Sequence, residues 1–154
     1  MAIVRILVDG FSLLHNWPQL APGKPRHSAA AREELIRLLT RYADACGTPV
    51  TVIFDGAGAR PGTPSPPAAG ALEVLYSRGG QTADDIIERV THRMKPHGEV
   101  LVVTDDWAER ETVLALGGMA SSCVNFMAAV KAAMKELDHD IKLYNLRERN
   151  RFKR

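Results

Sequence analysis

Four short aliphatic runs, each ending at acidic or small polar residues, constrain the fold of this chain more than any other feature. The first run covers residues 3–8 and ends at Asp9, and the others cover residues 50–54, 72–76 and 100–103. Apolar runs of this length are typical of strands that are buried on both faces, as in a parallel sheet. The sequence therefore predicts a parallel sheet at the centre of the molecule.

Helical patterns of apolar residues lie between these runs. They predict helices over residues 29–46, 83–94, 107–116 and 124–137, and they leave room for a short edge strand at residues 119–121. Strands that alternate with helices form right-handed βαβ units. We therefore expect an α/β fold with a three-layer, doubly wound, mostly parallel sheet. Residues 56–71 are rich in Gly, Pro and Ala and predict a long loop, either functional or disordered.

The length and composition fit one domain of this kind. The chain has 154 residues, of which 45% are hydrophobic, and it contains two cysteines. No apolar run approaches the ~20 residues of a membrane helix, and the first residues do not form a signal peptide. Two cysteines cannot build a disulfide framework or a structural zinc site. We expect a single soluble domain over residues 1–141, located in the cytoplasm and without a membrane partner.

Positive charge is concentrated at the C-terminus, although the net charge of the chain is only +2. Residues 142–154 form a basic tail with Glu148 as the only acid; its basic residues are Lys142, Arg147, Arg149, Arg151, Lys153 and Arg154. Such a tail is either a solvated, frayed end or an arm that binds phosphate groups, and both interpretations remain open.

Carboxylates follow the ends of the predicted strands. Asp9 and Asp55 close the first two strands, Asp84 opens the helix after the third, and Asp106 follows the fourth. Because ligands of open α/β sheets bind at the carboxyl ends of the strands, we expect these acids to share one site. Crowded carboxylates favour a neutralising cation, and an all-oxygen site suits Mg²⁺ or Mn²⁺. Glu88 lies on the same helix face as Asp84, and the set predicts metal-assisted phosphodiester hydrolysis.

The same acids also have structural explanations. An Asp-Gly pair after a strand is a common turn, which would account for Asp9 and Asp55. Residues 82–85 have the pattern of a capping box, which employs Asp85 and leaves the residue before it without a capping role. Residues 106–109 form a second possible box with Asp106 as its N-cap. Capping and metal binding therefore compete as explanations.

Other phosphate-binding motifs are missing. The chain has no Gly-x-x-x-x-Gly-Lys-Ser/Thr and no Gly-x-Gly-x-x-Gly after a strand, which excludes a P-loop and a dinucleotide site.

Several segments match, in order, the motifs of one known family. They are Ile6 to Phe11, Trp17 to Leu20, Ala31 to Ile36, Val52 to Gly56, Tyr76-Ser77, Thr82 to Glu88, Val102 to Asp106, Gly117-Gly118 and Ser122. On these segments, which span residues 3 to 130, the chain resembles the NYN domain family, a PIN-like nuclease fold. The closest branch is that of the YacP-like proteins, several of which are regarded as ribonucleases.

The resemblance implies a catalytic site at the acidic edge. Its metal-binding acids fall on Asp9, Asp84 and Asp106, and Asp55 and Glu88 are implied as catalytic neighbours. Asp105, the acid before Asp106, stands where the family commonly has Ser. The resemblance therefore places the third metal ligand at Asp106.

Two positions depart from the family pattern. Ser12, which we also place in the catalytic site, replaces an Asn that would orient a water or a phosphate, and Asn125 stands where relatives often carry Glu. Thr104 and Ser122 match polar positions that are expected to line the site and contact nucleic acid.

Basic and aromatic residues near the acidic edge are candidates for nucleic-acid contacts. We prefer Arg32 and Arg78, with a solvated surface arginine as the alternative for each. The other candidates are Lys24, Arg26, Arg110 and Trp107.

The first hypothesis is a divalent-metal-dependent endoribonuclease that cuts single-stranded or loop RNA with Mg²⁺ or Mn²⁺ as the cofactor. The second is a catalytically weak or inactive module that binds RNA or the ribosome, and Ser12 and Asn125 favour it. The third is a nuclease acting on structured DNA. The expected partner is RNA, and the YacP resemblance suggests an association with the ribosome.

Overall fold

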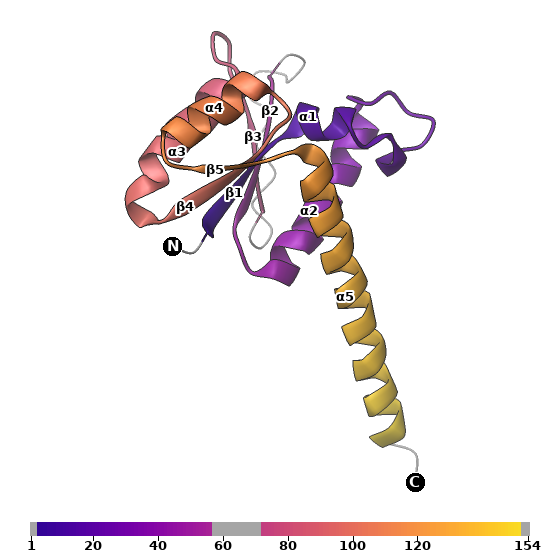
Figure 1. Ribbon diagram of the computed structural model, residues 1–154. Coiled ribbons are helices and arrows are strands. Elements are labelled where there is room, and N and C mark those ends of the chain that lie inside the picture. Colours follow the sequence, from indigo (N-terminus) through magenta and orange to yellow (C-terminus); the bar gives the residue numbers. More distant parts are fainter. Residues whose placement is uncertain (1–2, 57–71, 152–154) are drawn as a thin grey trace.

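The computed structural model describes residues 3–56 and 72–151. Its centre is a five-stranded, fully parallel sheet with the strand order β3-β2-β1-β4-β5 (Figure 1). The strands are β1 (Ile3–Asp9), β2 (Val50–Phe54), β3 (Leu72–Tyr76), β4 (Glu99–Val103) and β5 (Met119–Ser121). The predicted α/β architecture is confirmed, including the short edge strand.

Helices cover both faces of the sheet and complete three layers. On one face, Leu35 and Leu39 of α2 pack in the same core as Phe126 and Val130 of α5. On the other face, α3 and α4 enclose a smaller core around Ile87. The helices are α1 (Gly10–His15), α2 (Ala29–Cys46), α3 (Ala83–Met94), α4 (Trp107–Ala115) and α5 (Cys123–Arg151), with 3₁₀ turns η1 (Pro18–Leu20) and η2 (Lys95–His97).

Local signals explain where two helices begin and end. The Ser28 hydroxyl accepts a hydrogen bond from the backbone of Ala31 and starts α2, and Gly47 ends this helix with φ of 72°. At the start of α3, the capping box predicted for residues 82–85 is complete, because Thr82 and Asp85 each bond the backbone of the other.

The C-terminal helix is much longer than predicted. The pattern of apolar residues predicts an end at Leu137, but α5 continues to Arg151, so most of the predicted basic tail is helical. The reason is that residues 123–151 contain neither Gly nor Pro, and the charged residues of the tail are good helix formers. Lys153, Arg154 and residues 57–71 of the predicted loop lie outside the described part.

None of the helices within residues 3–56 and 72–151 has the length and hydropathy that a membrane span requires.

Candidate metal centre

Three carboxylates converge at the carboxyl edge of the sheet. Asp9 ends β1, Asp84 is in the first turn of α3, and Glu109 is in the first turn of α4. One oxygen from each of the three lies within 4.8 Å of the others. Because β1, α3 and α4 are far apart in the sequence, the fold itself assembles this cluster. Two of its members, Asp9 and Asp84, are among the predicted metal ligands, and Glu109 is not.

Asp9 is held in place by both of its carboxyl oxygens. Its Oδ1 accepts a hydrogen bond from the backbone N–H of Ser12 (3.3 Å) and caps α1, and its Oδ2 accepts one from the Thr104 hydroxyl (3.2 Å). Burial raises the pKa of Asp9 to about 6, against these two hydrogen bonds, which lower it, and with smaller contributions from the charges of Asp84 and Asp55. The turn expected at Asp9-Gly10 is instead the start of α1, and the helix cap and the cluster use the same side chain.

Glu109 is the most unusual residue of the cluster. Glu109 is only 3% exposed, and no donor among the described residues bonds either of its carboxyl oxygens. Burial raises the pKa of Glu109 well above neutral pH; a hydrogen bond to the Asp84 carboxyl, which the protonated form makes, and the charges of Asp84, Asp9 and Asp106 raise it further. A buried carboxyl without partners costs free energy, which a proton or a cation can offset.

Asp106 lies next to the cluster and is the N-cap of α4. Its Oδ1 accepts hydrogen bonds from the backbone of Ala108 (3.0 Å) and Glu109 (3.3 Å). Its own backbone N–H donates to the Thr104 hydroxyl (3.2 Å) and not to Glu109. The capping box suggested by residues 106–109 is thus only half formed, and this leaves the Glu109 carboxyl free to turn inward.

Asp55 is not a member of the three-carboxylate cluster, but it binds the backbone next to Asp84. Its Oδ1 accepts a hydrogen bond from the backbone N–H of Ala83 (2.8 Å) and one from the Ser77 hydroxyl (3.5 Å). Because Ala83 is the residue before Asp84, this contact fixes the start of α3. The backbone of residue 56 approaches Ser77 closely, and only Gly allows this, since a Cβ atom at position 56 would lie 1.7 Å from the carbonyl oxygen of Ser77. Asp55 is therefore a positioning residue for Asp84.

Ser12 belongs to a network that joins α1 to the starts of α4 and α5. Its hydroxyl accepts a hydrogen bond from the backbone N–H of Asp105 (3.0 Å) and one from the thiol of Cys123 (3.5 Å). The Asp105 carboxylate in turn binds Asn16 (2.7 Å), the backbone of Cys123 (2.9 Å) and Arg110 (3.0 Å). These contacts use the Asp105 carboxylate to hold α1, α4 and α5 together.

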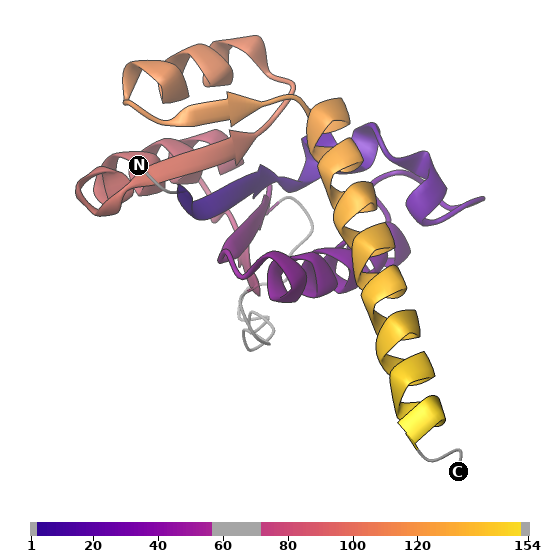
Figure 2. The same ribbon diagram turned by 60° about the horizontal axis from the view of Figure 1, so that its bottom comes forward.

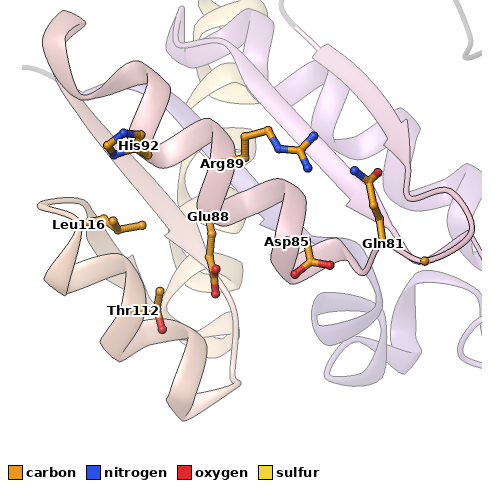
Figure 3. Close-up of a pocket in the computed structure, with 8 residues that line it drawn as sticks. Gln81, Asp85, Glu88, Arg89, His92, Thr112 and Leu116 are labelled. Atoms are coloured by element: carbon orange, nitrogen blue, oxygen red, sulfur yellow. The ribbon is translucent and has the colours of Figure 1, made fainter.

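Glu88 lines a groove of about 560 Å³ between α3 and α4. Figure 3 shows Asp85, Glu88 and His92 along α3, with Thr112 of α4 and Leu116, the C-cap of α4, opposite. Glu88 is outside the three-carboxylate cluster. Its predicted catalytic role remains a prediction.

The predicted nucleic-acid contacts fall into two groups. Thr104 is fully buried and holds Asp9, while the Ser122 hydroxyl caps the first turn of α5 through the backbone of Asn125 (3.1 Å). Arg110 is bound to the Thr104 carbonyl (2.7 Å) and to Asp105. These three residues have structural partners.

The remaining predicted contacts are accessible. Trp107, the first residue of α4, is 69% exposed. Lys24, Arg26 and Arg78 are exposed in loops, and Arg32 is half-buried on α2.

A comparison with known proteins decides the family. A model of the YacP-like NYN domain matches residues 6–154. The chain belongs to this family. It is 25% identical over 138 residues to the protein named "Uncharacterized protein YacP" of Bacillus subtilis (strain 168), an alignment that covers 89% of this chain and 81% of the relative.

Solved structures confirm the fold. The crystal structure of Rae1 (YacP) from Bacillus subtilis matches with a TM-score of 0.80 and 23% identity, over 97% of this chain and 85% of the other. The structure of a point mutant of Rae1 matches with a TM-score of 0.76 and 24% identity, over 92% and 82%. The predicted membership of the YacP-like NYN family and its nuclease-type fold are thus confirmed.

The donor set fits a hard divalent cation. All three clustered side chains offer carboxylate oxygens, and the orphaned oxygens of Glu109 lack any other ligand among the residues that the structure describes. Asp9, Asp84 and Glu109 are the residues that would hold the ion, with Asp106 beside them.

Proposed function

We propose that this protein is a metal-dependent endoribonuclease that hydrolyses phosphodiester bonds of single-stranded or loop RNA. The observation that carries the proposal is Glu109, a buried carboxyl that receives no hydrogen bond from the residues that the structure describes and that faces two further carboxylates. A core residue with only a structural role would be paired or apolar. The nuclease-type fold of the family supports the same conclusion.

We propose Mg²⁺ or Mn²⁺ as the cofactor, held by Asp9, Asp84 and Glu109. A divalent cation supplies the positive charge that this hydrolysis needs, because it lowers the pKa of the attacking water and stabilises the leaving oxygen. The protein contributes the geometry: Thr104 orients Asp9, Asp55 fixes the helix start that carries Asp84, and burial keeps bulk water away from Glu109.

We propose that the RNA backbone runs along the exposed basic residues near this edge. Arg78 is exposed and lies two residues after the end of β3, and Arg32 is half-buried on α2. Trp107 adjoins Asp106, and an exposed indole there offers a base a surface for stacking. RNA as the substrate rests on the family and on these cationic and aromatic residues.

The experiment is cleavage of labelled single-stranded RNA with Mn²⁺, Mg²⁺ or EDTA, with DNA of the same sequence beside it. Asp84→Asn should abolish cleavage and weaken Mn²⁺ binding measured by calorimetry. Asp85→Asn is the matched control, because the neighbouring Asp85 serves the capping box and should leave the rate unchanged. Cleavage that survives EDTA, or a normal rate in Asp84→Asn, would overturn the proposal.

One observation favours a second function, an RNA- or ribosome-binding module without efficient turnover. The Ser12 hydroxyl, which replaces the family's amide, is bound to Asp105 and Cys123 and supplies no donor to the carboxylate cluster. In that case wild type and Asp84→Asn should bind RNA equally and neither should cut it.

A further inference from the structure

The last four turns of α5 extend beyond the rest of the molecule. The helix has 29 residues and is about 43 Å long. Its first half packs against α2 and the sheet, and the ion pair between Arg41 and Asp138 (3.8 Å) lies near the end of this contact. Figures 1 and 2 both show the remainder projecting away from the sheet and from α2.

The projecting segment keeps the apolar stripe of the packed half. Beyond the buried Val130, apolar side chains follow at spacings of four and three residues, at Met134, Leu137, Ile141 and Tyr144, so they share one face of the helix. Met134 still contacts the core, whereas Ile141 is 47% and Tyr144 is 63% exposed. The stripe that binds α5 to its own domain thus continues onto a face that the domain does not cover.

A helix of this kind gains little stability alone. Isolated helices shorter than about 12–15 residues are marginal in water, and most helical stability in proteins comes from packing of the apolar face. A second surface that covers Leu137, Ile141 and Tyr144 would supply this packing. The charges beside the stripe indicate which surface this is.

Charges of opposite sign lie at the two ends of the projecting segment. Asp138 and Asp140 are at the end near the domain, and Arg147, Arg149 and Arg151 are at the far end. Asp140 and Arg147 are seven residues apart and therefore lie on the same flank of the apolar stripe.

We propose that this segment pairs with the same segment of a second copy of the chain, in an antiparallel arrangement. Ile141 then packs against Tyr144 of the second copy, and the two-fold axis repeats the contact. Because like flanks face each other in an antiparallel pair, Asp140 faces Arg147 of the second copy, also twice. In a parallel pair, Asp140 would face Asn145 or Asp138, and this complementarity would be lost. The inference does not depend on the proposed nuclease activity.

The test is the mass of the protein over about 5–200 µM, measured by sedimentation and light scattering. A reducing agent is included because Cys46 is exposed. We expect a reversible monomer–dimer equilibrium. Ile141→Asp should weaken it at least tenfold. Leu146→Asp is the matched control, since Leu146 is 49% exposed and lies nine residues after Leu137, on the opposite side of the helix.

A charge exchange tests the antiparallel register. Asp140→Arg and Arg147→Asp should each weaken the dimer about tenfold, because each places like charges opposite one another. The double exchange should restore the wild-type dissociation constant within about threefold.

Three results would overturn the proposal: a monomer at 200 µM, equal effects of Ile141→Asp and Leu146→Asp, or no rescue by the double exchange. A protein that stays monomeric, and in which Arg147→Asp weakens RNA binding and lowers its salt dependence, would identify the segment as an RNA-binding arm instead.

Discussion

Replacing Glu109 by Gln should stabilise the metal-free protein at neutral pH, although it removes a carboxylate from the candidate metal centre. In the unfolded chain this carboxyl has a pKa of about 4.5, whereas burial and the neighbouring Asp84 carboxyl raise the pKa in the folded protein well above neutral pH. Between these two values, the unfolded chain releases a proton that the folded protein keeps. Rising pH therefore favours unfolding over this range.

The size of the stability change follows from the difference between the pH and the pKa of the unfolded carboxyl. At pH 7.5 the unfolded carboxyl lies about three pH units above its pKa, which corresponds to about 4 kcal/mol of lost stability at 1.36 kcal/mol per unit. Gln does not titrate, but its buried amide is incompletely hydrogen-bonded and returns part of this gain. We expect a net stabilisation of about 2–4 kcal/mol, or about 5–15 °C in the melting temperature of a chain of this length.

The assay is thermal unfolding in EDTA between pH 4.5 and 8. The stability of Glu109→Gln relative to wild type should be lowest at pH 4.5, where the folded wild type is protonated and its unfolded carboxyl is about half protonated, and should grow with pH. Glu111→Gln, at an exposed position of the same helix, is the control and should change stability by less than about 0.5 kcal/mol. With Mn²⁺ present, wild type should gain stability and Glu109→Gln should gain less.

Two results would refute this reasoning. A variant that is less stable than wild type at every pH would mean that Glu109 has a hydrogen-bond partner that Gln cannot keep. A difference in melting temperature that does not change with pH would mean that the Glu109 carboxyl titrates normally in the folded protein.

Three further predictions concern the surroundings of the cluster. Asp85→Asn should cost about 1 kcal/mol in urea unfolding, the usual contribution of a helix cap, because only the bond to the Thr82 backbone is weakened. Gly56→Ala should cost more than about 2 kcal/mol, since the new Cβ would overlap the Ser77 carbonyl; an unchanged midpoint in urea would contradict that contact. Ser12→Asn should preserve or raise RNA cleavage, because an amide oxygen can still accept the bond from the Asp105 backbone, and a tenfold slower rate would show that the hydroxyl itself is needed.

Burial on both faces is the reason that the sheet could be predicted from the sequence. All five residues of β2 are buried, whereas the edge strand β3 has Glu73 exposed but is apolar for most of its length. A polar residue follows each of these strands, and the bounds of both agree with the prediction residue by residue. The short helix α1 was missed because it begins at the Asp9-Gly10 pair, which is also the signal for a turn. The length of α5 was missed because the basic residues from Lys142 onward have the composition of a solvated tail, although the apolar spacing continues through Ile141 and Tyr144.

The candidate site could be predicted only where acids end strands. Asp9 was found in this way, and Asp84 was found because the capping box beside it had no use for its side chain. Glu109 was missed because it stands in the capping position of residues 106–109, where a capping role accounts for an acid. One signal was available: Glu109 lies four residues before the buried Val113 and therefore on the inward face of α4.

The N-termini of α3 and α4 show how an acid that caps a helix differs from an acid that joins the carboxylate cluster. The difference is whether both hydrogen bonds of the capping box are formed. At α3, the Asp85 carboxylate accepts a hydrogen bond from the backbone N–H of Thr82 and is exposed, so its negative charge stabilises the helix terminus. At α4, the corresponding bond is absent, because the backbone N–H of Asp106 donates to the Thr104 hydroxyl. Thr104 thereby replaces Glu109 in the cap and, through the same hydroxyl, orients Asp9. The buried Thr104 thus leaves the Glu109 carboxylate free for the cluster and positions the Asp9 carboxylate. Replacing Thr104 by Val should therefore disturb the positions of both carboxylates.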